Sequence, residues 1–406
     1  MKKLLYWGLF AMLSFSASAQ SPSEKLTQAL EQSFQQSTMP GAAVAIVSKD
    51  KVLYQNAFGY ADVAKQTPYT PQTIHNIGSI SKTFIGIALL QLVEAGKLEL
   101  DVNINSYLPF QIQHPYHSNT PITLRQLATH TGSIRDRNFN YSLRSYVSND
   151  DKKGNRKGLP LIYKIQFNRM LKNEQVSLGE FLKRTLAKEG KWYKKKNFHK
   201  HAPGTVEEYS NIGSAIAAYI IEVVTQQKYS DYIVENILQP LGMTTSGWTL
   251  EEVNTTQFAK RYIGEKAVPN YRLITYPDGG LISSTQDLST YLMAMLKGYY
   301  GESNILPASA FQTLLQNQYQ GTPLSKTTAA LKSRRGIFWD IFGETGTGDI
   351  GHSGSDPGIT TFMYFNPDTG IGCILTTNVD THTHGEQVVK LWRLLIKHRV
   401  DFELVL

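Results

Sequence analysis

The pattern of apolar positions predicts β-strands near both ends of the chain. Residues 42–47 and 51–57 are strand-like runs on either side of Ser48-Lys49-Asp50, which is typical of a β-hairpin. Near the C-terminus, residues 360–365 and 372–377 predict two neighbouring strands joined by a turn. Because both ends of the chain supply strands, we expect a sheet in which the two ends lie together.

Between these strands the pattern is mainly helical. One helix begins at Ser79, and its body at residues 84–95 is apolar on nearly every face, which predicts burial on all sides. Further helices are predicted at residues 22–36, 123–129, 178–186, 213–226, 230–238, 286–296 and 386–397. We therefore predict an α/β (α+β) fold. A mainly antiparallel sheet domain is built from both termini and flanked by helices, and an all-helical domain is inserted in it.

The length of the chain fits one large unit made of two interlocked subdomains. We place this unit at residues 20–406. The sheet subdomain takes about residues 20–75 and 276–406, and the helical subdomain about residues 76–275.

The first 19 residues have the features of a secretory signal peptide. Met1 is followed by two lysines, an apolar run extends to Phe15, and Ala17-Ser18-Ala19 precedes Gln20. The run is shorter than the roughly 20 apolar residues of a membrane-spanning helix. We therefore expect cleavage after Ala19 and a periplasmic or secreted protein; an uncleaved membrane anchor is the alternative.

Positive charge is concentrated in one segment. Residues 144–200 hold 16 basic and 5 acidic residues, in a chain whose formal net charge is +8. One interpretation is a surface that attracts an anionic cell-envelope partner, such as a wall polymer or lipid head groups, and the other is a solvated loop. Binding to anionic vesicles that weakens steeply with salt would distinguish them. An exported chain without a nucleic-acid-binding motif is not expected to bind nucleic acid.

Three short motifs in a fixed order carry the candidate chemistry. They are Ser79-Ile80-Ser81-Lys82, Tyr209-Ser210-Asn211 and His352-Ser353-Gly354. Each motif alone is weak, because similar patterns occur at Ser48–Lys51, at Tyr54 and Tyr364, and at His130-Thr131-Gly132. Context separates these copies from the set, since Ser48 and Lys51 fall in a hairpin turn, the two tyrosines fall in strands, and His130 precedes Tyr209.

Ser79 and Lys82 lie on one face of a helix, about 5–6 Å apart at their Cβ atoms. A serine is a poor nucleophile until a base removes its proton. At the start of a buried helix an amine is partly desolvated, which favours the neutral form that accepts a proton. The alternative is a helix cap at Ser79 and a solvated lysine.

The other two motifs supply groups that could complete this chemistry. Tyr209 stands in a loop before a predicted helix, where its hydroxyl can pass a proton. Asn211 offers a donor and an acceptor to an amide-like substrate. We expect the third motif on an edge strand that faces Ser79, so that the amides of Ser79 and Ser355 form an oxyanion hole. The alternatives are a tyrosine that packs and a histidine at a strand end.

In this order the motifs resemble the serine β-lactamase and penicillin-binding-protein superfamily, and more narrowly its class C β-lactamase, D,D-carboxypeptidase and esterase branch. Residues 123–131, 279–284 and 351–354 add to the resemblance, which covers most of the mature chain. It implies that Ser79 is the acylated nucleophile and that Lys82 and Tyr209 transfer protons. The substrate-binding residues that it implies are Asn211, His352, Ser353, Gly354 and Ser355.

No cofactor is needed by this mechanism, and no metal site is expected. The two imidazoles of His382-Thr383-His384 are explained by the start of a helix. The substrate is expected to be a small molecule or a peptide.

Two departures from the family pattern shape the expected activity. Many β-lactamases of the superfamily have Lys-Thr-Gly where this chain has His352-Ser353-Gly354, and a histidine there is known among its peptidases and esterases. The branch often has His-Thr-Ser-Gly where this chain has His130-Thr131-Gly132-Ser133, and residues 135–201 form a predicted insertion beside the cleft. We expect an exported serine hydrolase that is peptidase-like or esterase-like, rather than a true β-lactamase. The alternative is a catalytically silent protein of the same fold that binds the cell wall or an anionic surface.

Overall fold

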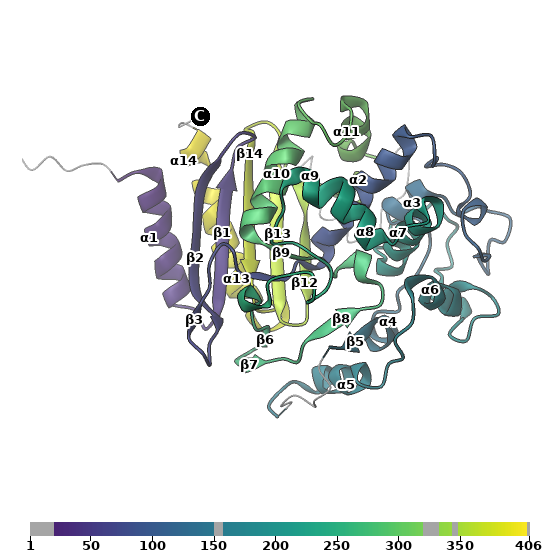
Figure 1. Cartoon of the computed structure of the whole chain (residues 1–406), viewed down its shortest axis with the longest axis horizontal. Helices are drawn as coiled ribbons and strands as arrows, with labels where there is room; N and C mark the ends of the chain where they lie inside the picture. The colour runs from purple at the N-terminus through teal and green to yellow at the C-terminus, as the bar shows by residue number, and fades with distance from the viewer. Residues whose placement is uncertain (1–19, 150–156, 320–332, 343–347, 404–406) are drawn as a thin grey trace, which may run out of the picture.

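The computed structural model describes residues 20–149, 157–319, 333–342 and 348–403, so the predicted signal peptide lies outside the described residues. At its centre is an eight-stranded antiparallel sheet, with the strand order β10-β11-β12-β13-β14-β1-β2-β3 (Figure 1). The strands are β1 (Gly41–Val47), β2 (Val52–Asp62), β3 (Thr67–Pro68), β10 (Ser333–Arg335), β11 (Asp340–Phe342), β12 (Ile350–Asp356), β13 (Ile359–Asn366) and β14 (Ile371–Thr377). β1 pairs with β14, with Ala42 opposite Thr377. The two ends of the chain thus share the sheet, as the apolar pattern predicts.

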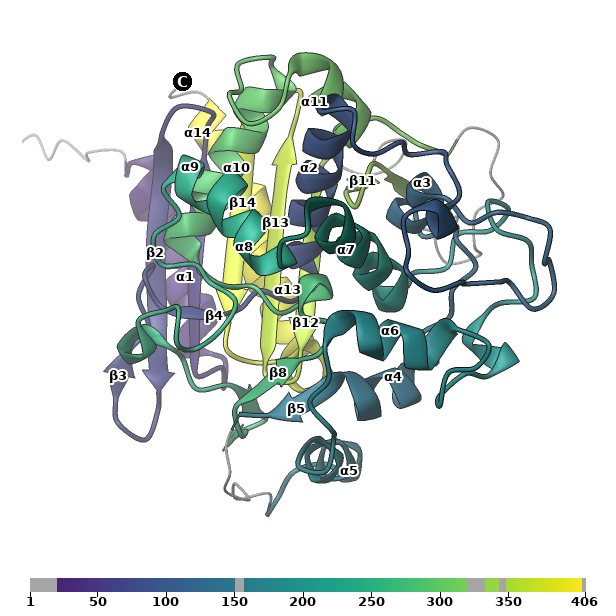
Figure 2. The ribbon, with the colours of Figure 1, turned by 45° about the vertical axis from the view of Figure 1, so that its right-hand side comes forward.

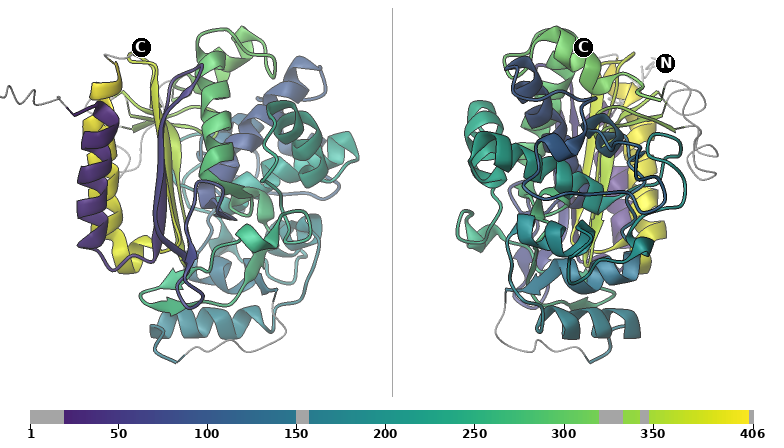
Figure 3. Two further views of the ribbon diagram at one scale, coloured as in Figure 1. Left: turned by 60° about the vertical axis from the view of Figure 1, so that its left-hand side comes forward. Right: turned by 90° about the vertical axis from the view of Figure 1, so that its right-hand side faces the viewer.

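Helices cover both faces of this sheet. On one face α1 (Pro22–Gln35) and α13 (Thr381–His398) lie side by side, as Figure 3 shows on the left, and α14 (Val400–Glu403) follows α13. On the other face α10 (Thr285–Tyr299) packs against β1 and β14. All seven residues of β1 are buried, because Val44 and Ile46 belong to the core on the α1 side and Ala45 and Val47 to the larger core opposite.

A largely helical region completes the larger core. Figure 2 shows α2 (Ser81–Glu94) beside α7 (Asn211–Thr225) in this region. Its other helices are α3 (Leu124–Ala128), α4 (Asn138–Ser145), α5 (Leu161–Met170), α6 (Leu178–Leu186), α8 (Tyr229–Ile233) and α9 (Gln239–Leu241), with α11 (Ala308–Leu315) following α10. Single helical turns are η1 (Gly78–Ile80), η2 (Ile104–Ser106), η3 (Lys195–Asn197), η4 (Val234–Leu238), η5 (Thr255–Gln257) and η6 (Tyr276–Asp278). Within the described residues, no helix is both long enough and apolar enough to cross a membrane.

Three two-stranded ribbons accompany these helices. They pair β4 (Ile74–Asn76) with β9 (Ile282–Ser284), β5 (Tyr146–Ser148) with β8 (Tyr271–Leu273), and β6 (Tyr262–Ile263) with β7 (Lys266–Ala267). The β5–β8 ribbon ties the insertion to the segment that leads back to the sheet. The β4–β9 ribbon lies directly before η1 and so fixes the entrance to α2.

The buried helix predicted after Ser79 is present as α2. Its residues 81–90 are all buried, and the ring of Phe84 stacks on that of Tyr291 of α10 with 4.1 Å between centroids. The sequence has no polar face here because α2 packs against α7, α8 and α11 and, through Phe84 and Tyr291, against α10. A helix held on all sides gives its first turn a fixed position, and Lys82 belongs to that turn.

One expectation about the sheet is wrong. The third motif lies on β12, which is not an edge strand, because β11 and β10 lie outside it. β11 pairs with β12 only through Asp340 with Gly351 and Ile341 with Ile350. The short β10–β11 hairpin was missed because strands of three residues show no readable alternation. Residues 352–356 have ladder partners on β13 alone within the described part of the chain.

Candidate active site

The hydroxyl of Ser79 and the amine of Lys82 are in direct contact. Ser79 lies in η1, Lys82 lies one turn later at the start of α2, and Lys82 Nζ is 2.9 Å from Ser79 Oγ. The amine also donates to the main-chain carbonyl of Asp278. Lys82 is 0% exposed, and both of these partners are uncharged. Neither η1 nor α2 has a side-chain cap, so Ser79 does not act as a helix cap.

Tyr209 covers this pair from the open side of the site. Its ring centroid lies 5.1 Å from Lys82 Nζ, and its side chain is 37% exposed. The ring of His130 packs against it with 4.3 Å between centroids. The tyrosine therefore lies over the serine–lysine pair with its ring toward the amine of Lys82.

A buried carboxylate that the sequence did not reveal holds the second motif. Asp136 accepts hydrogen bonds from the amide of Asn211 at 2.8 Å, from Asn211 Nδ2 at 2.9 Å, from Ser210 Oγ at 2.8 Å and from the amide of Ile212 at 3.1 Å. It thus satisfies amides at the start of α7 that have no partner within the helix. Burial raises the pKa of Asp136, and the bonds from Asn211 and Ile212 oppose this shift. One donor of Asn211 is therefore already used, which leaves its carbonyl oxygen for a ligand.

Replacing Asp136 by alanine is expected to lower the free energy of unfolding by about 2–4 kcal/mol. The change removes a helix cap, worth roughly 0.5–2 kcal/mol, and leaves buried amides without acceptors at about 1–3 kcal/mol. Urea unfolding followed by circular dichroism measures the loss. Asp101→Ala is the matched control, because Asp101 pairs with Arg125 at the surface and such a pair contributes about 0–1 kcal/mol. Equal losses in the two variants would contradict the capping role.

The third motif presents a neutral imidazole to the site. His352 is buried, and burial, with Lys82 and Arg335 nearby, lowers its pKa to about 3. Its Nδ1 lies 2.6 Å from the carbonyl oxygen of Ser353. Because a carbonyl only accepts, Nδ1 carries the proton and Nε2 is a bare acceptor. Nε2 is buried and has no partner among the described residues. His352 therefore holds an acceptor without a partner, and not a positive charge, near the ring of Tyr209.

The backbone of β12 meets the turn that carries Ser79. Gly78 has a φ of +57°, and a Cβ added there would lie 2.8 Å from the amide nitrogen of Ser355. A Cβ added at Gly354 would lie 2.0 Å from the carbonyl oxygen of Ile77. Two glycines thus permit a backbone approach that any side chain would block. This contact brings the amide of Ser355 beside the turn of Ser79, as an oxyanion hole made by their two amides requires.

Two further side chains of the site were not found from the sequence. His130, which the order of motifs excluded as a third motif, accepts a hydrogen bond from the amide of Ser210 at 3.3 Å through Nδ1 and supports Tyr209. Arg335 of β10 lies 5.8 Å from the ring centroid of Tyr209 and pairs with Glu207 at 3.4 Å and with Asp340. His130 stands in a recognisable segment, but its spacing does not show that it supports Tyr209, and no local pattern marks Arg335.

The insertion contacts the residue that holds the lysine. The carboxyl of Asp278 accepts a hydrogen bond from Tyr141 of α4, and Tyr141 also bonds Thr275 at 2.8 Å. Burial raises the pKa of Asp278 to about 7, against the opposing effects of Lys82 and of the Tyr141 hydrogen bond. Asp278 thus orients Lys82 through its main-chain carbonyl, and the insertion holds Asp278 in place through the Asp278 side chain.

A cavity of about 820 Å³ lies next to these segments, and residues of the three motifs do not line it. Its wall includes Arg261, which is buried, lies 3.8 Å over the ring of Tyr271 and donates to Asn76 Oδ1 at 2.8 Å. Asn76 donates in turn to the carbonyl of Gly280 at 3.0 Å. These contacts brace the segment before Ser79 and the segment after Asp278.

A serine and a buried lysine at a helix start, with a tyrosine above them and a strand backbone beside them, define a serine hydrolase of the penicillin-binding-protein and β-lactamase type. Residues 26–396 match the family model described as Beta-lactamase. The chain therefore belongs to the beta-lactamase family. The resemblance seen in the motifs and the predicted fold class are both confirmed.

Two known proteins are similar to this chain over most of its length. Protein flp of Staphylococcus aureus (strain N315) is 24% identical over 381 residues, which cover 93% of this chain and 67% of that protein. The human mitochondrial serine beta-lactamase-like protein LACTB is 27% identical over 348 residues, which cover 74% of this chain and 62% of LACTB.

Solved structures show the same fold. The octameric penicillin-binding protein homologue from Pyrococcus abyssi has a TM-score of 0.71 and 26% identity, over 92% of this chain and 77% of that chain. The beta-lactamase/D-alanine carboxypeptidase from Yersinia pestis, complexed with citrate, has a TM-score of 0.66 and 19% identity, over 93% of this chain and 98% of that chain. At 19% identity the second likeness is one of fold.

Proposed function

We propose that this protein cleaves amide or ester bonds of a small-molecule or peptide substrate through an acyl-enzyme on Ser79. The observation that carries the proposal is the 2.9 Å contact between Lys82 Nζ and Ser79 Oγ at a buried helix start. The alternative, in which Lys82 is a solvated lysine, does not agree with its complete burial. A catalytically silent protein of the same fold would have no use for this contact together with Tyr209 above it.

The mechanism follows from the positions of these groups. Lys82 takes the proton of Ser79 as its oxygen attacks the substrate carbonyl. The amides of Ser79 and Ser355 stabilise the oxyanion, and one such donor contributes about 3–4 kcal/mol to the transition state. Tyr209 passes a proton to the leaving group, which departs and leaves the acyl group on Ser79, and Tyr209 regains a proton from the protonated Lys82. Water then attacks the ester while Lys82 takes one of its protons, and that proton passes to Ser79 Oγ as the acid is released.

The third motif supports a peptidase or esterase over a β-lactamase. A lysine at the position of His352 would offer a cation to a substrate carboxylate, whereas neutral His352 offers the acceptor Nε2. Arg335 does not replace that cation, because Glu207 and Asp340 already balance its charge. We propose that the preferred substrates place an N–H or O–H donor against His352.

The N-terminal pattern supports export of this enzyme to the periplasm or the medium. A lysine-rich start, a short apolar run and Ala17-Ser18-Ala19 are what signal peptidases require. The mature enzyme would then begin at Gln20, directly before α1.

One experiment tests both proposals. Protein purified from the cell envelope or medium is treated with a fluorophosphonate and analysed by intact mass and peptide mapping. We expect a chain that begins at Gln20 and carries one adduct, on the peptide that contains Ser79. A folded protein without an adduct would overturn the catalytic proposal and favour the wall-binding alternative. A chain that still begins at Met1 would overturn export without affecting the catalytic proposal.

A further inference from the structure

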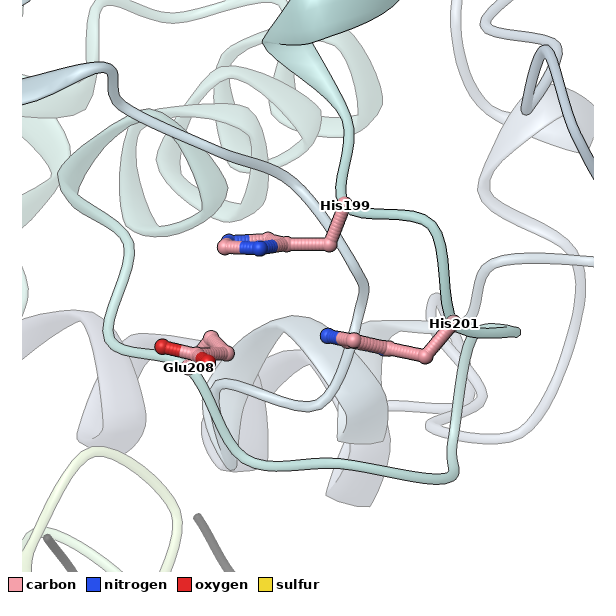
Figure 4. Close-up of side chains that lie close together, drawn as sticks. All are labelled: His199, His201 and Glu208. Carbon is pink, nitrogen blue, oxygen red and sulfur yellow. The ribbon is translucent and has the colours of Figure 1, made fainter. Parts of the chain in front are cut away.

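Outside the catalytic residues, two histidines and a glutamate gather at the end of the insertion. Their ligand atoms, on His199, His201 and Glu208, all lie within 4.8 Å of one another. The two imidazoles are stacked with 5.1 Å between centroids and 16° between planes. Figure 4 shows both rings projecting from neighbouring loop positions toward the side of the loop where Glu208 lies. The three residues thus face one small volume.

The backbone that carries these side chains is fixed by a single segment. The amide of His199 donates to the carbonyl of Ser133 at 3.0 Å, and Ser133 Oγ donates to the carbonyl of His201 at 2.7 Å. The amide of Glu208 donates to the carbonyl of His130 at 2.8 Å. All three positions are therefore held against residues 130–133, whether or not an ion is bound. Such a site loses little chain entropy when it takes a ligand.

The imidazole of His201 lacks hydrogen-bond partners among the described residues. Both ring nitrogens of His201 are buried and have no partner among the described residues. A buried polar atom without a partner costs about 1–3 kcal/mol, so the imidazole fits a site that a ligand completes. Ring nitrogens of histidine are among the commonest protein ligands of a metal ion.

We propose that His199, His201 and Glu208 bind one divalent transition-metal ion of the Zn²⁺ type. Two imidazoles and one carboxylate suit Zn²⁺ and its first-row neighbours, whereas Ca²⁺ and Mg²⁺ prefer oxygen ligands alone. A water molecule can fill the fourth position. The site is not part of the proposed hydrolytic mechanism, and it stands whether or not Ser79 is a nucleophile.

To bind one ion, the stacked imidazoles must turn so that a lone pair of each ring points at the same place. Zn²⁺ bonds of about 2.0–2.2 Å place tetrahedral ligands about 3.4 Å from one another. The observed limit of 4.8 Å therefore requires the ligand atoms to approach one another by up to about 1.4 Å. Glu208 is exposed and can make this movement. Once bound, the ion links the end of the insertion to the residue before Tyr209, and we expect it to raise the melting temperature.

The test uses the mature protein without an affinity tag, stripped with EDTA and titrated with ZnCl₂ by calorimetry. We expect one ion per chain, and visible d–d absorption of a tetrahedral site when Co²⁺ replaces Zn²⁺. His201→Ala should weaken Zn²⁺ binding by about tenfold or more and abolish the Co²⁺ bands. Glu208→Gln, a change at an exposed side chain, should weaken Zn²⁺ binding similarly.

The chain offers a matched control. His382 and His384 have the same spacing as His199 and His201, and His382 is exposed at the start of α13. His382→Ala should bind Zn²⁺ as the wild type does. The proposal is overturned if the wild type shows no saturable binding, if His201→Ala and Glu208→Gln bind as tightly as the wild type, or if His382→Ala loses binding to the same extent as they do. A circular-dichroism melt of each variant establishes that it is folded.

Discussion

Replacing Ser79 by alanine is expected to lower kcat/KM by about four to six orders of magnitude. Lys82, Tyr209 and the amide of Ser355 remain in place, but no oxygen is left to form the acyl-enzyme. Because an oxyanion hole without a nucleophile still accelerates hydrolysis weakly, a small residual rate is expected. Steady-state hydrolysis of an activated ester, followed by release of the leaving group, measures the effect.

Ser48→Ala is the control for this substitution. Ser48 has the same Ser-x-x-Lys spacing as Ser79, but its hydroxyl accepts a hydrogen bond from the amide of Lys51 at 3.3 Å in the β1–β2 turn. The side chain of Lys51 is exposed. Ser48→Ala should therefore retain wild-type turnover. Wild-type activity in Ser79→Ala would refute the assignment of the nucleophile. Loss of activity in Ser48→Ala would show that the motif at Ser48, and not the motif at Ser79, is needed for turnover.

Features of the fold that depend on local patterns were predictable from the sequence. The continuous apolar run of α2 predicts a helix buried on all sides because each of its faces meets another element of the core. The strands β1 and β14 are buried along their whole length, and their apolar runs at opposite ends of the chain predict a shared sheet. In both cases most residues of one segment are buried, so burial can be predicted from the apolar composition of that segment.

Contacts between residues that lie far apart in the sequence could not be predicted in this way. Asp136 lies 75 residues before Asn211, and only the docking of the loop after α3 onto α7 brings its carboxylate to those amides. Tyr141 reaches Asp278 across 137 residues in the same way. A single buried acid or tyrosine has no periodicity, so nothing in the sequence separates it from residues that are exposed or merely packed.

The histidine cluster shows how spacing alone can mislead. His382-Thr383-His384 attracts attention as two imidazoles at a helix start, yet His199-Lys200-His201 has the same spacing within a basic run. The third member of the second group, Glu208, becomes its neighbour because residues 130–133 hold both loop segments. His199, His201 and Glu208 are a candidate ligand set because of the backbone contacts of Ser133 and His130, and not because of the spacing of the two histidines.

Replacing Lys82 by alanine is expected to slow acylation of Ser79 by several orders of magnitude, because no other base touches its hydroxyl among the described residues. Because Lys82 is fully buried, alanine also leaves a cavity. Lys82→Met removes the amine but nearly keeps the side-chain volume, so it separates loss of the base from the effect of the cavity. Both variants should react slowly with the fluorophosphonate, as followed by intact mass over time. Lys51→Ala, at the exposed copy of the motif, should react at the wild-type rate.

Lys82→Arg distinguishes a proton acceptor from a positive charge. Arginine keeps a cation near Ser79, but its guanidinium stays protonated and cannot accept the serine proton. If Lys82 acts as the base, Lys82→Arg should acylate as slowly as Lys82→Met. Acylation of Lys82→Arg near the wild-type rate would show that the charge, and not proton transfer, activates the serine. An unchanged rate in Lys82→Ala and Lys82→Met would remove the lysine from the mechanism, although it lies only 2.9 Å from Ser79 Oγ.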